Sequence, residues 1–238
     1  MYQIEISDFT IDVVLKSIKN IHLSVYPPTG RVRVAAPLET DNETIKLFAI
    51  SKLSWIRRNQ RKFEQQDRQS VRVLKTRESH YFAGKRYLLR VIEHEASPKV
   101  EIKSKTHIDL YMRPNTSTEQ RQSILNEWYR RQLKNLIPDI ITKWEKIIDV
   151  QVNDWGVKQM KTKWGTCNIE DKRIWINLEL AKKPIQCLEY IVVHEMIHLL
   201  ERHHNDRFLF YIDKFLPQWK KLKVELNTLP VSHGDWGY

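Results

Sequence analysis

The segment "LEYIVVHEMIHLLERHHNDRF", residues 188–208, restricts the possible folds more than any other part of the chain. Apolar side chains precede its first histidine and surround its second, so a helix formed here is apolar on nearly every side. Such a helix must lie in the protein interior, covered by other elements. Pro184 can begin this helix. The helix should end near Arg202, because Asn205 is a suitable N-cap for a following helix.

Two histidines and a glutamate interrupt this apolar surface. His194 and His198 are four residues apart, so both side chains lie on one helix face and can bind a single ion. Glu195 lies on the adjacent strip, which suits a base acting on a metal-activated water. This H-E-x-x-H spacing is typical of zinc peptidases. The alternative is a pair of core histidines that are hydrogen-bonded to the backbone.

The third ligand must come from beyond the helix, since a catalytic zinc ion usually has three protein ligands and a water. His204 directly precedes the expected cap and can turn back towards the ion, whereas His203 should point the other way. Glu201 is a further candidate. The expected ligands of one Zn²⁺ ion are therefore His194, His198 and His204, with Glu195 as the catalytic base. Imidazoles also suit Ni, Co, Cu or Fe, and no substrate-binding residue is assigned.

The rest of the chain alternates between strand-like and helical patterns. Two strands joined by a turn are expected in "IHLSVYPPTGRVRVAAP", and a helix from Asp41 or Asn42 to about residue 66. "HYFAGKRYLLRVIEH" and "KVEIKSKTHIDLYMRP" indicate further strands. A long helix should then begin near Ser117 or Thr118 and be interrupted or kinked before Pro138. "VQVNDWGVKQM" and "RIWINLEL" predict two more strands.

This order of elements predicts an α+β fold with small antiparallel sheets and helices packed to one side. We expect a β-rich module with one long helix at residues 1–115, and a metal-binding catalytic domain at residues 116–238. No internal repeat is evident in the sequence. Cys167 and Cys187 are the two cysteines of the chain, so a disulfide scaffold is not expected and a cytoplasmic location is.

A net charge of +11 raises the question of acidic partners. Basic residues gather in "WIRRNQRKFEQQDRQSVRVLKTR", which would attract nucleic acid or nucleotides weakly. The alternative is a solvated helix face. No helix-turn-helix or zinc-finger pattern accompanies the charge. No apolar run approaches the roughly 18 residues of a membrane helix, and no signal peptide is recognisable.

The segments "MKTKWGTCN", "IWINLEL" and "YIVVHEMIHLLERHHNDRF" together resemble the YgjP-like family of zinc metallopeptidases, related to the WLM and SprT-type zincins. This resemblance implies a zincin-like catalytic core with an N-terminal β-rich part. It also implies a third histidine six positions after the second, which is His204. Thr166 stands where the family usually has serine, and His203 where it has asparagine.

The leading hypothesis is therefore zinc-dependent hydrolysis of peptide bonds in a peptide or protein substrate. The strand around Trp175 to Glu179 is expected to bind an extended substrate as an added strand. One alternative is a nucleotide pyrophosphatase that uses Lys161, Lys163 and Trp164 to bind phosphates and a base. Another is a nucleic-acid-associated module with a structural zinc. Cys167 is expected to pack rather than to bind metal.

Overall fold

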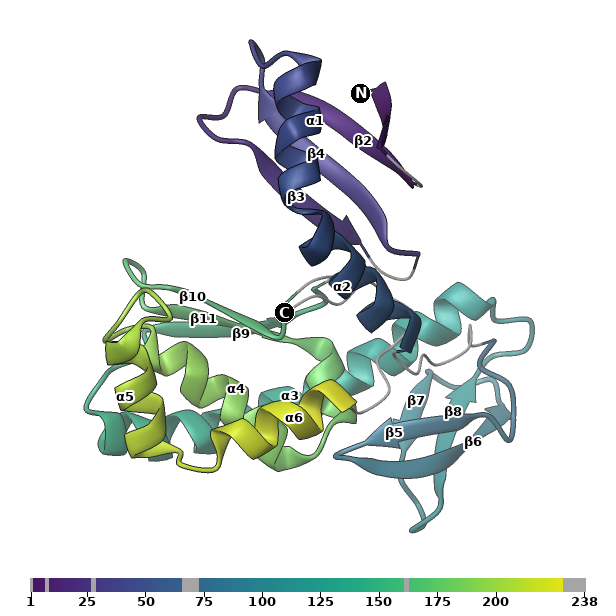
Figure 1. Ribbon diagram of the computed structural model, residues 1–238. Coiled ribbons are helices and arrows are strands. Elements are labelled where there is room, and N and C mark those ends of the chain that lie inside the picture. Colours follow the sequence, from purple (N-terminus) through teal and green to yellow (C-terminus); the bar gives the residue numbers. More distant parts are fainter. Residues whose placement is uncertain (1, 7–8, 27–28, 66–72, 161–162, 229–238) are drawn as a thin grey trace. The chain divides into compact units, whose positions relative to one another are not determined.

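The computed structural model describes residues 2–6, 9–26, 29–65, 73–160 and 163–228 (Figure 1). It divides into two compact units, residues 1–68 and 69–229. The described residues form six α-helices and three sheets, so the α+β class is confirmed. Each sheet also contains one parallel strand pair, which sequence alternation does not reveal. No helix in the described ranges has the length and apolar character needed to cross a membrane.

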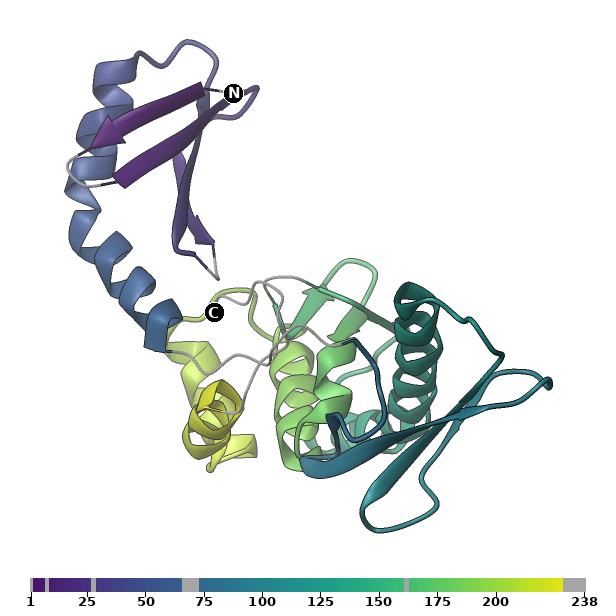
Figure 2. The same ribbon diagram turned by 90° about the vertical axis from the view of Figure 1, so that its right-hand side faces the viewer.

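The first unit is a four-stranded sheet with helices on one face (Figure 2). In spatial order its strands are β1 (Tyr2–Ile6), β2 (Phe9–Lys16), β4 (Arg31–Pro37) and β3 (His22–Tyr26). The hairpin expected at β3 and β4 is confirmed. Side chains alternate between the two faces of each strand, and one set joins the helices in a hydrophobic core. Its buried members are Ile4, Ile6, Ile11, Val13, Val32, Val34, Ala36, Ile45, Ala49 and Ile56.

Two helices complete this unit, α1 (Asn42–Ser51) and α2 (Leu53–Gln65). Asp41 caps α1, because its side chain accepts the backbone N–H of Thr44 at 2.7 Å. The expectation of one helix up to residue 66 is wrong, since the helices separate at Lys52. The hydroxyl of Ser51 donates to the carbonyl of Phe48 at 2.7 Å. Such a side-chain bond competes with the helical hydrogen-bond ladder.

The second unit begins with a sheet that repeats the strand order of the first. Its strands are, in spatial order, β5 (Ser79–Phe82), β6 (Lys85–Glu93), β8 (His107–Met112) and β7 (Lys99–Glu101). In both sheets the two outer pairs are antiparallel, the middle pair is parallel, and a helix follows the fourth strand. The chain therefore contains the same supersecondary structure twice, although the sequence shows no repeat.

The long helix α3 (Thr118–Ile148) follows this sheet. Ser117 and Gln120 form a capping box, in which each side chain accepts a hydrogen bond from the other residue's backbone N–H. The helix runs through Pro138 without interruption. Proline removes one backbone hydrogen bond, and the buried apolar face of α3 compensates for this loss by packing against η1, α4 and β9.

A three-stranded sheet and three helices complete the second unit. The strands are, in spatial order, β10 (Gly165–Asn168), β11 (Arg173–Asn177) and β9 (Asp154–Lys158). The short 3₁₀ helix η1 (Leu178–Lys182) leads to α4 (Ile185–Ile197), α5 (Asp206–Phe215) and α6 (Trp219–Thr228). Helix α4 packs against β10 and β11 on one side and against α3, α5 and α6 on the others (Figure 1). This central position explains its apolar surface.

Candidate active site

Helix α4 carries the first two histidines of the H-E-x-x-H motif. It ends at Ile197, with His198 as its C-cap, so the expected end near Arg202 is wrong. The backbone N–H groups of the next two residues bond to carbonyls three residues back, which tightens the last turn as in a 3₁₀ helix. The backbone N–H of Glu201 bonds to the carbonyl of Ile197, and the chain then changes direction over residues 202–205, before α5.

Three histidines come together at this change of direction. The ligand nitrogens of His194, His198 and His204 all lie within 4.8 Å of one another. The Nε2 atoms of His194 and His204 are 2.9 Å apart, and the ring centroids of His198 and His204 are 4.7 Å apart. In the part of the chain that the structure describes, no other three His, Cys, Asp or Glu side chains meet in this way. We call these three residues the histidine cluster.

The other two candidates for a third ligand lie outside the histidine cluster. His203 is exposed, and its backbone N–H donates to Glu201 Oε1 at 3.1 Å. The second carboxylate oxygen of Glu201 lies 4.0 Å from Arg207 Nε. Asn205 caps α5 as expected, accepting the N–H of Phe208 at 3.0 Å. The cap fixes where α5 starts, and thereby places the preceding histidine beside the end of α4.

Two further contacts hold the imidazoles in place. Phe208 is buried, and its ring centroid lies 4.9, 4.8 and 4.7 Å from those of His194, His198 and His204. Nδ1 of His198 lies 3.1 Å from the carbonyl oxygen of Glu201. A hydrogen bond at Nδ1 leaves Nε2 available as a metal ligand. The sequence did not indicate the role of Phe208, because its contacts depend on how α5 packs against α4.

The environment of the histidine cluster favours neutral imidazoles. The pKa of His194 is lowered to about 3, first by burial and then by the neighbouring imidazoles and Lys223. Burial also lowers the pKa of His198 and His204. A histidine must be neutral to bind a metal ion. All three side chains are therefore in the form that binds metal at neutral pH.

Glu195 lies between α4 and the edge of the β10 sheet and is 3% exposed. Burial raises its pKa to about 8, and the positive charge of Lys163 opposes this shift. Gly165 of β10 lies directly against it: a Cβ atom at Gly165 would be 2.6 Å from Glu195 Oε1. This contact explains why glycine occupies position 165, since any side chain there would overlap the carboxylate of Glu195.

Cys167 is half-buried on the same strand. Burial and the nearby Glu195 raise the pKa of its thiol to about 12. A thiol with a raised pKa is protonated at neutral pH and is therefore a poor nucleophile. Cys167 also lies outside the histidine cluster, as expected of a packing residue. Lys161, one of the phosphate-binding candidates from the sequence, lies outside the described residues.

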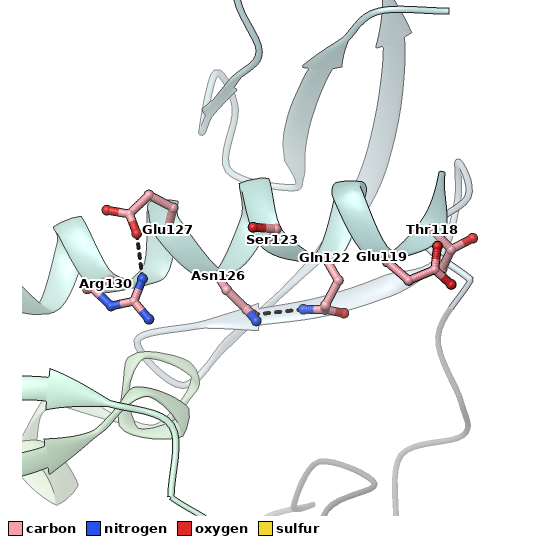
Figure 3. A pocket seen from close by; sticks show the side chains of 7 residues that line it. All are labelled: Thr118, Glu119, Gln122, Ser123, Asn126, Glu127 and Arg130. Atoms are coloured by element: carbon pink, nitrogen blue, oxygen red, sulfur yellow. Dashed lines mark hydrogen bonds and ion pairs between the residues drawn. The ribbon is translucent and has the colours of Figure 1, made fainter. Parts of the chain in front are cut away.

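A shallow hollow of about 470 Å³ lies along the N-terminal half of α3 (Figure 3). Its polar side chains contact one another along the helix: Gln122 donates to Asn126 at 2.8 Å, and Arg130 pairs with Glu127. No member of the histidine cluster lines it. We therefore place the candidate active site at the histidine cluster and Glu195.

A family model described as "YgjP-like, metallopeptidase domain" matches residues 19–229. The chain belongs to the YgjP-like metallopeptidase family. The resemblance seen in the sequence is thus confirmed. Membership indicates a metal-dependent hydrolase that acts on peptide or protein substrates.

The other two comparisons add little. The crystal structure of the metallopeptidase zymogen of Pyrococcus abyssi abylysin is similar to part of the chain, with 17% sequence identity and a TM-score of 0.36. The similarity covers 38% of this chain and 90% of that chain. A TM-score this low carries no inference about the site. No curated protein matches the sequence.

The residues present fit the metal ion that this family implies. Three neutral imidazoles converge from the end of α4 and the start of α5, and imidazole nitrogen is a common ligand of divalent transition metals. Glu195 follows His194 in α4, and burial alone favours the protonated form of its carboxyl group. A nearby divalent cation stabilises the ionised carboxylate that a catalytic base requires.

Proposed function

We propose that the protein is a zinc-dependent peptidase in which His194, His198 and His204 bind one Zn²⁺ ion and Glu195 is the general base. The observation that carries this proposal is the approach of the ligand nitrogens of the three imidazoles to within 4.8 Å, on a helix whose next residue after His194 is the buried Glu195. Residues 116–238 are proposed to supply the catalytic residues. When bound, the ion lowers the pKa of a water molecule and polarises the carbonyl group of the substrate.

Glu195 moves the proton in this mechanism. Its carboxylate takes a proton from the attacking water, and the protonated carboxyl group later donates it to the leaving amine. The backbone at Gly165 prevents the side chain from moving towards β10. Burial excludes bulk water from Glu195, so the proton stays available for the amine.

An extended substrate is proposed to pair with β10. The expectation that the strand around Trp175 to Glu179 binds the substrate is wrong, because β11 lies between β10 and β9 and η1 begins at Leu178. β10 is an outer strand of this sheet and packs directly against α4. An extended peptide can add to an outer strand by backbone hydrogen bonds, which would place its scissile bond close to Glu195.

The two alternative functions, a nucleotide pyrophosphatase and a nucleic-acid-associated module with a structural zinc, have less support. Trp164 is 3% exposed and packs beneath the ammonium group of Lys183, 5.5 Å from its ring centroid. A buried indole is not available to stack on a nucleotide base. A structural zinc with four protein ligands would need His203 as well, and this side chain lies apart from the histidine cluster.

A cytoplasmic location is proposed from the two free cysteines alone.

The proposal is tested by Glu195→Gln, with zinc content and peptide hydrolysis measured on the same preparations. The amide is nearly the same size but cannot accept a proton. We expect zinc to remain bound, and hydrolysis of a casein or a peptide library to fall by at least about 10³-fold, since proton transfer and charge are both lost. Undiminished hydrolysis would exclude Glu195 as the base.

A further inference from the structure

Asn177 is the last residue of β11, and its side chain is completely buried. Its Nδ2 atom donates to the carbonyl groups of Met160 and Lys163 at 3.0 and 2.6 Å. Its Oδ1 atom accepts the N–H of Glu179 at 3.1 Å and lies 3.4 Å from the N–H of Met160. The side-chain amide therefore acts as both donor and acceptor. Most of these hydrogen bonds connect Asn177 to the segment between β9 and β10.

That segment leads directly into the active site. It connects β9 to β10, and its described residues are Gln159, Met160, Lys163 and Trp164. The backbone N–H of Asn177 donates to the carbonyl group of Trp164 at 2.9 Å. The next residue is Gly165, whose backbone lies against the carboxylate of Glu195. Asn177 thus fixes the segment at its start through the side chain and at its end through the main chain.

The segment also carries a positive charge towards the site. Lys163 is exposed, yet its carbonyl group accepts the shortest of the Asn177 hydrogen bonds. Its positive charge opposes the effect of burial, which raises the pKa of Glu195. A fixed backbone at Lys163 limits where this long side chain can reach.

Asparagine suits this position better than any residue of similar size. Aspartate has almost the same shape, but it has no N–H donors and would place a negative charge against two carbonyl oxygens. Leucine would leave the carbonyl groups of Met160 and Lys163 without the donor that Asn177 provides. Only a short primary amide offers donors and an acceptor in this geometry.

We propose that Asn177 is a positioning residue: it holds the chain at Met160 and Lys163, and so sets the start of the substrate-binding strand β10, whose Gly165 lies against Glu195. This inference rests on the proposed function. Asn177 itself touches neither the substrate nor the reacting atoms. It acts through the backbone that leads into Gly165, which lies against Glu195.

The test compares Asn177→Asp and Asn177→Ser with wild type in zinc content, hydrogen exchange and peptide hydrolysis. We expect wild-type zinc content in both variants and faster exchange of the amides near Met160 and Trp164. We expect kcat/KM to fall by about 10²-fold in Asn177→Asp, because misplacement by about 1 Å at a reacting site has this effect. Serine keeps one hydroxyl donor, so Asn177→Ser should recover part of the loss, and it serves as the test if the aspartate variant does not fold.

Asn153→Asp is the matched control. The N–H of Asn153 donates to the carbonyl group of Lys172 at 3.0 Å, and its amide to that of Asp171 at 3.4 Å. The same substitution at Asn153 disturbs a turn at the opposite end of β11, so wild-type kcat/KM is expected.

The inference would be overturned if both Asn177 variants showed unchanged hydrogen exchange near Met160 and unchanged kcat/KM. A lower melting temperature with no change in either quantity would also overturn it. Absence of peptide hydrolysis by zinc-loaded wild type would instead count against the proposed function, while exchange still tests the positioning role.

Discussion

The backbone of Gly165 in β10 lies against the side chain of Glu195 in α4, so closely that a Cβ atom at Gly165 would be 2.6 Å from Oε1 and 2.7 Å from Cγ. Real Cβ atoms do not approach other heavy atoms to this distance, so a larger residue at Gly165 must displace the glutamate. The strand next to α4 therefore determines where the proposed catalytic base lies.

Gly165→Ala should lower kcat of peptide hydrolysis by about 10²-fold while zinc content stays unchanged, because only Glu195 is displaced. Zinc content and steady-state kinetics provide the check. Gly156→Ala is the control, since its Cβ atom would overlap the ring of Trp175 instead, at 2.4 Å. That variant should lose stability but keep kcat per folded molecule. Equal losses of kcat in the two variants would show that the contact with Glu195 has no special role.

Phe208 is the common packing partner of the histidine cluster, with ring centroids 4.7–4.9 Å from all three imidazoles. Phe208→Leu should weaken zinc binding by about 10-fold, as changes behind metal ligands usually do, and cost about 1–2 kcal/mol of stability. Competition with a chelator measures the zinc affinity. Phe210→Leu, at a side chain that is 62% exposed, should change neither. Wild-type zinc affinity in Phe208→Leu would mean that the aromatic ring does not support the ligands.

Lys183 is 4% exposed, and burial lowers its pKa to about 8. Between pH 8 and the ordinary lysine value of about 10.5, the unfolded chain binds more protons than the folded one, so stability rises with pH in this window. Below pH 8 the buried ammonium group of Lys183 is charged, so the full free-energy cost of burying this charge lowers the stability of the folded protein. Lys183→Met should therefore raise the free energy of unfolding by about 2 kcal/mol at pH 7. The gain should shrink as the pH approaches 10.5.

Thermal denaturation at pH 7 and pH 10 measures this difference. Lys182→Met is the matched control, because Lys182 pairs with the buried carboxylate of Glu179 at 2.7 Å. Removing that partner leaves a buried charge unpaired and should destabilise the protein at pH 7. A stabilisation by Lys183→Met of the same size at both pH values would exclude the buried charge as its cause.

The parts of the site that follow from local periodicity could be read from the sequence. Helical spacing alone places His194 and His198 on one face. The capping side chain of Asn205 marks where α5 begins, and this favours His204 over His203 as the third member of the cluster. These inferences need only the geometry of one helix and one cap.

Non-local features could not be read in this way. β10 has four residues, too few for a recognisable alternation, and its place at the edge of the sheet depends on strand order. Asn177 lies inside the segment "RIWINLEL" that was predicted as a strand, and its bonds to the chain between β9 and β10 arise only in the folded protein. The two sheets with the same topology share a strand order and not a sequence, so no repeat was visible beforehand.

The most direct test of the account is the zinc content of purified wild type, His204→Ala and His203→Ala, measured by elemental analysis after dialysis against a weak chelator. We predict about one zinc ion per chain in wild type and in His203→Ala, and loss of zinc from His204→Ala, since two imidazoles hold the ion far more weakly than three. Full zinc content in His204→Ala, or its loss from His203→Ala alone, would contradict the proposed site.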